Sequence, residues 1–258
     1  MLLQFKNLNS FIELSPAQET KMQELVEHIS STDRVQVYFV DEAAIDRYLR
    51  KHKYEGIEHM DNPITEWLGF YTRGFDRWTQ KEYASIHLCL EKIEMLVSTQ
   101  KEFEYLVAKV LIHEIAHMLF DRDDLKNARS LRFHTVCETL EESFANLYTL
   151  QFFRDLRNEA NNYFDEFYDF DELFFYVVSF VRKQPPQYKF GYDLFRLGYT
   201  YDLWLNRRAT CALLDHDESR KILSTIWSGK GDEEIVEAMR PFEEKVRLKE
   251  ALYRFLNI

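Results

Sequence analysis

Glycine and proline are scarce in this chain, which has seven glycines and five prolines among 258 residues. All-β folds use many turns built from these residues, so their scarcity favours a fold rich in helices. Cysteine is rarer still, and Cys89, Cys137 and Cys211 show no C-x-x-C spacing. An odd number of scattered cysteines argues against a disulfide framework and predicts reduced thiols in a cytoplasmic protein.

We expect neither a membrane nor nucleic acid among the partners of this chain. No apolar run approaches the length of a membrane span, and the first residues have neither the basic start nor the apolar run of a signal peptide. The net charge is −11 and no block of basic residues is present, which argues against nucleic acid or an anionic membrane as the main partner. The sequence leaves the oligomeric state open.

Apolar and aromatic residues, by contrast, are plentiful: 46% of the chain is hydrophobic, with 21 phenylalanines and 15 tyrosines. This content is ample for a hydrophobic core. Stretches rich in β-formers at residues 34–40 and 67–72, and an alternating stretch at 84–93, predict strands. We expect an α+β fold, with a small antiparallel or mixed sheet near the N-terminus and a mainly helical C-terminal part.

One predicted helix carries an unusual set of polar residues. Residues 101–120 are largely apolar, yet they contain an H-E-x-x-H pentad at residues 113–117. A helix places residues i and i+4 on one face, so His113 and His117 can offer two imidazole nitrogens to one metal ion, while Glu114 can reach a water on that ion. A metal would satisfy these three groups inside a buried helix. The alternative is an amphipathic helix with incidental histidines.

A catalytic zinc usually has three protein ligands and one open position for water. The helix predicted over about residues 134–157 supplies three candidate glutamates. Glu142 ranks first, because it shares a helical stripe with small or polar residues, as a helix lying close to the pentad helix requires. Glu138 ranks second and Glu141, which points toward aromatic residues, ranks third. The alternative for these glutamates is a solvated, acidic helix start. Asn146, one turn after Glu142, is a candidate for orienting a ligand histidine.

The order of strand, H-E-x-x-H helix and glutamate helix resembles the gluzincin class of zinc metallopeptidases. The run E-S-F-A-N at residues 142–146 is also similar to the E-x-x-A-N pattern of small gluzincins and of ImmA/IrrE-type regulatory metallopeptidases. The resemblance covers about residues 67–157. Many gluzincins have an acidic residue four positions after the ligand glutamate, whereas this chain has Asn146 there.

This resemblance implies one Zn²⁺ ion bound by His113, His117 and Glu142, with Glu114 as the general base. It also implies that residues 85–93 line the cleft and pair with an extended substrate. A zincin-like catalytic core is expected over residues 1–160. A helical extension over residues 161–258 is expected to pack on that core or to continue it.

We therefore expect a zinc metalloendopeptidase that hydrolyses a peptide or protein substrate with a metal-activated water. The donor to the oxyanion is left open among one histidine and three tyrosines: His134, Tyr148, Tyr188 and Tyr192. One alternative is a metal-binding regulatory or interaction protein without turnover. The other is a latent protease whose own segment blocks the cleft.

Overall fold

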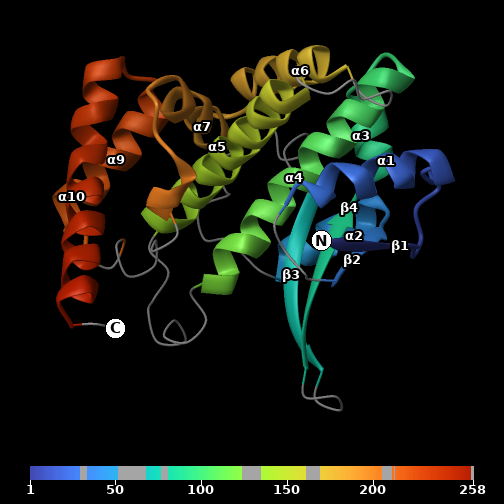
Figure 1. Cartoon of the computed structure of the whole chain (residues 1–258), viewed down its shortest axis with the longest axis horizontal. Helices are drawn as coiled ribbons and strands as arrows, with labels where there is room; N and C mark the ends of the chain where they lie inside the picture. Colours follow the sequence, from blue (N-terminus) through green and yellow to red (C-terminus); the bar gives the residue numbers. More distant parts are fainter. Residues whose placement is uncertain are drawn as a thin grey trace. The chain divides into compact units, whose positions relative to one another are not determined.

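The computed structural model confirms the α+β fold, with a four-stranded sheet near the N-terminus and a mainly helical C-terminal part (Figure 1). It describes residues 1–29, 34–51, 68–76, 81–123, 135–160, 169–204, 211 and 213–256. The chain forms two compact units, each made of two segments. Unit 1 comprises Met1–Met118 and Asp155–Val177, and unit 2 comprises Leu119–Arg154 and Val178–Ile258. The domain boundary expected near residue 160 stays a prediction.

The sheet belongs to unit 1 and is mixed, in the order β1-β2-β4-β3. Its strands are β1 (Leu2–Asn7), β2 (Arg34–Phe39), β3 (Gly69–Asp76) and β4 (Lys81–Leu88). β1 and β4 run parallel to β2, and β3 runs antiparallel to β4. Val35, Val37 and Phe39 alternate with less buried residues along β2, which is the pattern of a strand with one face against a core.

The position of β4 inside the sheet corrects one expectation. β4 ends at Leu88, and α3 (Leu90–Met95) follows it where the alternating stretch at 84–93 predicts a continued strand. Ser85 to Leu88 pair with β2 on one side and with β3 on the other. The implied pairing of residues 85–93 with a substrate is therefore wrong, because this segment has no open edge. Among the described strands, β3 is the antiparallel strand at the edge of the sheet.

Helix α1 of unit 1 begins where the local sequence satisfies a first backbone N–H group of the helix. Ser15 caps α1 (Pro16–Glu27): its side chain accepts from the N–H of Gln18, and the Gln18 side chain accepts from the N–H of Ser15. The Lys21 ammonium then pairs with Glu104 of α4 (Gln100–Asp123) at 2.8 Å. α2 (Glu42–Lys51) and the start of α6 (Phe170–Arg182) complete the helices of this unit, together with parts of α4 and of α5 (Thr135–Ala160).

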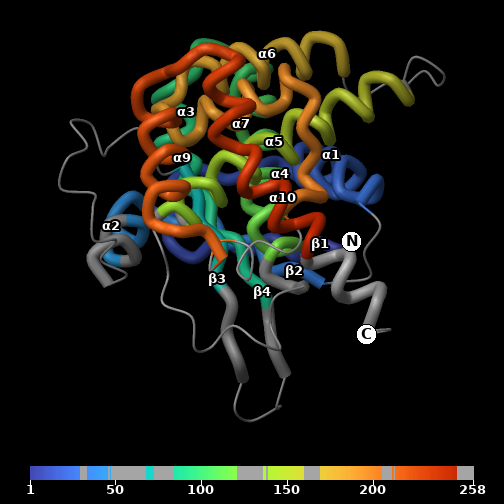
Figure 2. The backbone as a smooth tube through the Cα atoms, turned by 90° about the vertical axis from the view of Figure 1, so that its left-hand side faces the viewer, coloured from blue at the N-terminus to red at the C-terminus, as the bar shows by residue number. Residues whose placement is uncertain are grey.

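Unit 2 is built on an aromatic core. Trp204 is fully buried and stacks on Phe144 and Phe242, with ring centroids 4.6 and 5.8 Å apart. These residues come from three separate elements: η3 (Tyr201–Trp204), α5 (Thr135–Ala160) and α10 (Asp232–Leu256). Figure 2 shows α10 beside α9 (His216–Ser228). This stacking joins the C-terminal helices to the helix that carries the predicted glutamates.

Pro241 lies inside helix α10, which continues on both sides of it. A proline removes one helical hydrogen bond and usually bends or ends a helix. Met239 and Phe242, on either side of it, are fully buried. The packing of these two side chains offsets the local cost, which a reading of the sequence alone could not weigh.

Candidate metal centre

The helix that carries the pentad is α4 (Gln100–Asp123), and its sequence explains both its start and its burial. The Thr99 hydroxyl accepts a hydrogen bond from the N–H of Glu102 at 3.1 Å, and the Glu102 carboxylate accepts from the N–H of Ser98 at 2.7 Å. Each of these two hydrogen bonds satisfies a backbone N–H group at the start of α4. Apolar side chains on several faces of α4 are fully buried: Leu106, Val107, Leu111, Ile112 and Ile115.

The two histidines of the pentad converge on each other. The Nε2 atom of His113 lies 3.3 Å from the Nε2 atom of His117, and the rings meet edge to face. Two nitrogens bound tetrahedrally to one ion, at the usual zinc–nitrogen length, are about 3.3 Å apart. The spacing of the two imidazoles is therefore the spacing that a shared metal ion requires.

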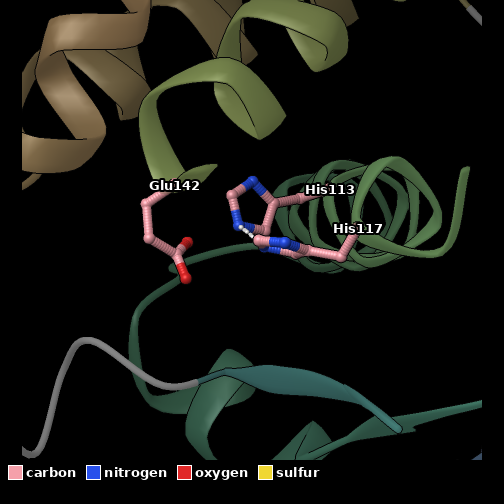
Figure 3. A group of neighbouring side chains, drawn as sticks. All are labelled: His113, His117 and Glu142. Atoms are coloured by element: carbon pink, nitrogen blue, oxygen red, sulfur yellow. Dashed lines mark hydrogen bonds between the residues drawn. The ribbon is translucent and has the colours of Figure 1, made fainter. Parts of the chain in front are cut away.

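Glu142 of α5 supplies a third donor atom. One ligand atom from each of His113, His117 and Glu142 lies within 4.8 Å of the other two. Figure 3 shows the Glu142 carboxylate next to the paired imidazoles. Among the described side chains, Glu141 is not a member of this group, and the side chain of Glu138 lies outside the described part of the chain. The three donors are compatible with a bound metal ion.

Glu114 follows His113 directly and is almost as deeply buried. The exposed fraction is 6% for Glu114 and 5% for His113. On a helix with about 3.6 residues per turn, Glu114 lies about 100° around the axis from His113 and about 60° from His117. It therefore lies beside the two imidazoles without sharing their stripe on the helix.

Asn146 does not have the contacts expected of a residue that orients a ligand histidine. Its amide nitrogen donates to the backbone carbonyl of Tyr188 at 3.1 Å and to the Gln184 side chain at 3.2 Å. Both acceptors lie in or just before α7 (Pro186–Arg196). The neighbouring Ser143 hydroxyl donates to the carbonyl of Gln187 at 2.6 Å. The polar part of the E-x-x-A-N run thus holds α7 against α5.

The candidate oxyanion donors have other surroundings. The Tyr148 ring packs edge to face on Tyr201, and burial raises the pKa of Tyr148 well above its ordinary value. The Tyr188 carbonyl accepts from Asn146, and the Tyr192 ring lies 5.4 Å from the Arg182 guanidinium. His134 lies outside the described residues. The identity of the oxyanion donor stays a prediction.

One buried residue near the pentad was not singled out from the sequence. Lys109 lies one helical turn before His113 on α4, and its exposed fraction is 3%. The sequence could have indicated Lys109, because it precedes His113 by four residues and residues four apart share a helix face. A lysine inside an otherwise apolar helix stretch is unusual in itself.

Comparison with protein-family models, with curated proteins and with solved structures finds no match in any of the three. In the part of the chain that the structure describes, no helix is both long enough and apolar enough to cross a membrane.

Proposed function

We propose that this protein is a zinc-dependent metallopeptidase of the gluzincin type that cleaves peptide or protein substrates. The observation that carries the proposal is the 3.3 Å spacing of the His113 and His117 Nε2 atoms, with a Glu142 oxygen within 4.8 Å of them. Two imidazoles and one carboxylate form a donor set of catalytic zinc sites, which keep a further position open. The resemblance of the strand, pentad helix and glutamate helix to gluzincins supports the same class.

In this proposal His113, His117 and Glu142 hold the ion, and Glu114 moves the proton. A bound zinc ion supplies Lewis acidity and lowers the pKa of a coordinated water. Glu114 accepts a proton from water during attack on the amide carbonyl, and later donates it to the leaving nitrogen. Burial of Glu114 at 6% exposure limits its contact with bulk water, so the proton it accepts is more readily returned to the substrate.

We further propose that an extended substrate pairs with β3 rather than β4. β3 has a single strand neighbour among the described residues, so its second edge can accept a peptide backbone. Gly69, at the start of β3, lies against α4: a Cβ at this position would stand 3.0 Å from Val110 Cγ1. Val110 precedes His113 by one turn, so the edge strand and the pentad are neighbours within unit 1.

The three cysteines are buried thiols, and this supports the expected cytoplasmic location.

The test of this function is the Glu114→Gln variant, assayed for zinc content and for cleavage of a mixed peptide library. We expect zinc content equal to that of the wild type, and cleavage reduced by at least about a hundredfold. Zinc retained by both proteins without any cleavage would instead favour a metal-stabilised interaction protein. Cleavage that appears only after truncation would favour the latent protease. Cleavage by Glu114→Gln at the wild-type rate would refute the assigned role of Glu114.

A further inference from the structure

Two fully buried polar side chains stand next to Glu142 on α5, and both are hydrogen-bonded to the segment that contains α7. Ser143 follows Glu142 directly, and Asn146 lies one turn after Glu142 on the same face of the helix. Together they donate three hydrogen bonds to residues 184–188. All of these residues belong to unit 2, so the contact is made inside one compact unit.

This contact leaves α5 little freedom to turn about its own axis. The Ser143 and Asn146 donors reach backbone carbonyls at 2.6 and 3.1 Å, and a Cβ at Gly191 of α7 would stand only 2.9 Å from Asn146 Cβ. Side-chain ends lie about 5 Å from a helix axis, so a rotation of α5 by about 10° would move the Glu142 carboxylate by about 0.9 Å. Metal–ligand bonds tolerate only about 0.2 Å. The rotation of α5 therefore decides whether Glu142 reaches the ion.

We propose that Asn146 and Ser143 are positioning residues of the metal centre: by anchoring α5 to α7, they set the rotation of α5 and hold the Glu142 carboxylate in place for the ion. The inference rests on the proposed function for the presence of the metal. It requires no contact between either side chain and the ion or the substrate. It also gives Asn146 a role other than orienting a ligand histidine, in agreement with its hydrogen bonds to the Tyr188 carbonyl and the Gln184 side chain.

Gln151 provides a matched comparison on the same helix. It is 5% exposed, its amide nitrogen donates to the Tyr199 carbonyl at 3.0 Å, and its amide oxygen accepts from the N–H of Tyr201 at 3.1 Å. Like Asn146, it is a buried amide with two hydrogen bonds to a later segment of unit 2. It lies nine residues after Glu142, about 13 Å along the axis and on the opposite side of α5. Loss of its hydrogen bonds should therefore cost stability without turning the part of α5 that carries Glu142.

The test measures the midpoint of urea denaturation, and zinc affinity by competition with a chelator, for the wild-type protein, Asn146→Ala and Gln151→Ala. Both variants should lower the denaturation midpoint by similar amounts, because each removes a buried amide with two hydrogen bonds. Asn146→Ala should bind zinc about tenfold more weakly, which is the size of effect typical of residues that orient metal ligands. Gln151→Ala should bind zinc as tightly as the wild type does.

A spectroscopic measurement separates positioning from a general loss of stability. Each protein is saturated with Co²⁺, whose visible absorption depends on its ligands and their geometry. The absorption of Asn146→Ala should shift toward that of Glu142→Ala, in which the third donor is absent. The absorption of Gln151→Ala should match that of the wild type, because its Glu142 keeps its place.

Wild-type zinc affinity in Asn146→Ala overturns the inference, and so does an equal loss of affinity in Gln151→Ala, since any loosening of α5 would then weaken the site. The proposed function stands in both cases. Zinc binding without peptide cleavage refutes the proposed function and leaves the inference intact. A wild-type protein that binds no zinc overturns the metal centre and the inference with it. Should Asn146→Ala not fold, Ser143→Ala removes the hydrogen bond to the Gln187 carbonyl and carries the same expectation.

Discussion

The packing of α7 against α5 leads to the sharpest prediction about the fold around the candidate site. Gly191 of α7 faces the turn of α5 that follows Glu142. A Cβ at Gly191 would stand 2.9 Å from Asn146 Cβ and 3.1 Å from the backbone nitrogen of Leu147, and closer still to the Ser143 carbonyl oxygen. These atoms belong to helix backbone and to buried side chains, so the two helices must separate to admit even a methyl group.

Gly191→Ala should therefore destabilise the protein by about 3–5 kcal/mol. Overpacking of this kind typically costs about 1–3 kcal/mol. Separation of the helices also weakens the hydrogen bonds from Ser143 to Gln187 (2.6 Å) and from Asn146 to Tyr188 (3.1 Å), each worth about 1 kcal/mol. The measurement is the midpoint of urea denaturation, followed by far-ultraviolet circular dichroism.

Gly229→Ala provides the matched control. No heavy atom lies within 4 Å of a Cβ at Gly229, but its φ of 59° is left-handed, so alanine there costs only about 1 kcal/mol of backbone strain. Gly191→Ala should lower the denaturation midpoint clearly more than Gly229→Ala does. A Gly191→Ala protein as stable as Gly229→Ala would refute the close approach of α5 and α7.

Three further predictions concern the sheet and the metal. Gly69→Ala should lower the thermal midpoint, at a cost of about 1–3 kcal/mol, because its Cβ would stand 2.8 Å from the His87 carbonyl oxygen. Burial lowers the pKa of His87 to about 4 from 6.5. The unfolded chain therefore binds the proton more tightly than the folded protein does. The free energy of unfolding should fall by about 2 kcal/mol as the pH drops from about 6.5 to about 4, after allowance for the partial exposure of His87. His87→Phe should flatten this pH dependence, as measured by acid denaturation. Zinc at a hundred times its dissociation constant should stabilise the protein by about 2.7 kcal/mol, seen as a higher thermal midpoint that a chelator reverses.

The part of the site that the sequence predicts best is the part that depends on local geometry. His113 and His117 are four residues apart on one helix, and an α-helix alone brings their Nε2 atoms to the same side. The Thr99 cap and the apolar spacing of α4 are equally local, and both are seen in the structure. These features follow from the chain without any knowledge of its tertiary contacts.

The rest depends on contacts between segments far apart in the sequence. Glu142 ranks first among the three candidate glutamates because it shares a helical stripe with small and polar residues, and the structure groups Glu142 with the two histidines. The small and polar residues of that stripe, however, pack against α7. Asn146 donates a hydrogen bond to the Tyr188 carbonyl of α7, and the backbone beside Asn146 faces Gly191. The strand order β1-β2-β4-β3 is likewise non-local. An alternating stretch shows which residues form a strand, but not whether the strand lies at the edge of the sheet.

The metal centre is tested most directly by zinc stoichiometry in three proteins: the wild type, Glu142→Ala and Glu141→Ala. Glu141 and Glu142 are adjacent on α5 and both half-buried, so the two variants remove the same chemical group from neighbouring positions. We predict one zinc ion per chain for the wild type and for Glu141→Ala, and loss of bound zinc for Glu142→Ala. Full zinc occupancy in Glu142→Ala, or its loss in Glu141→Ala, would contradict the assigned donor set.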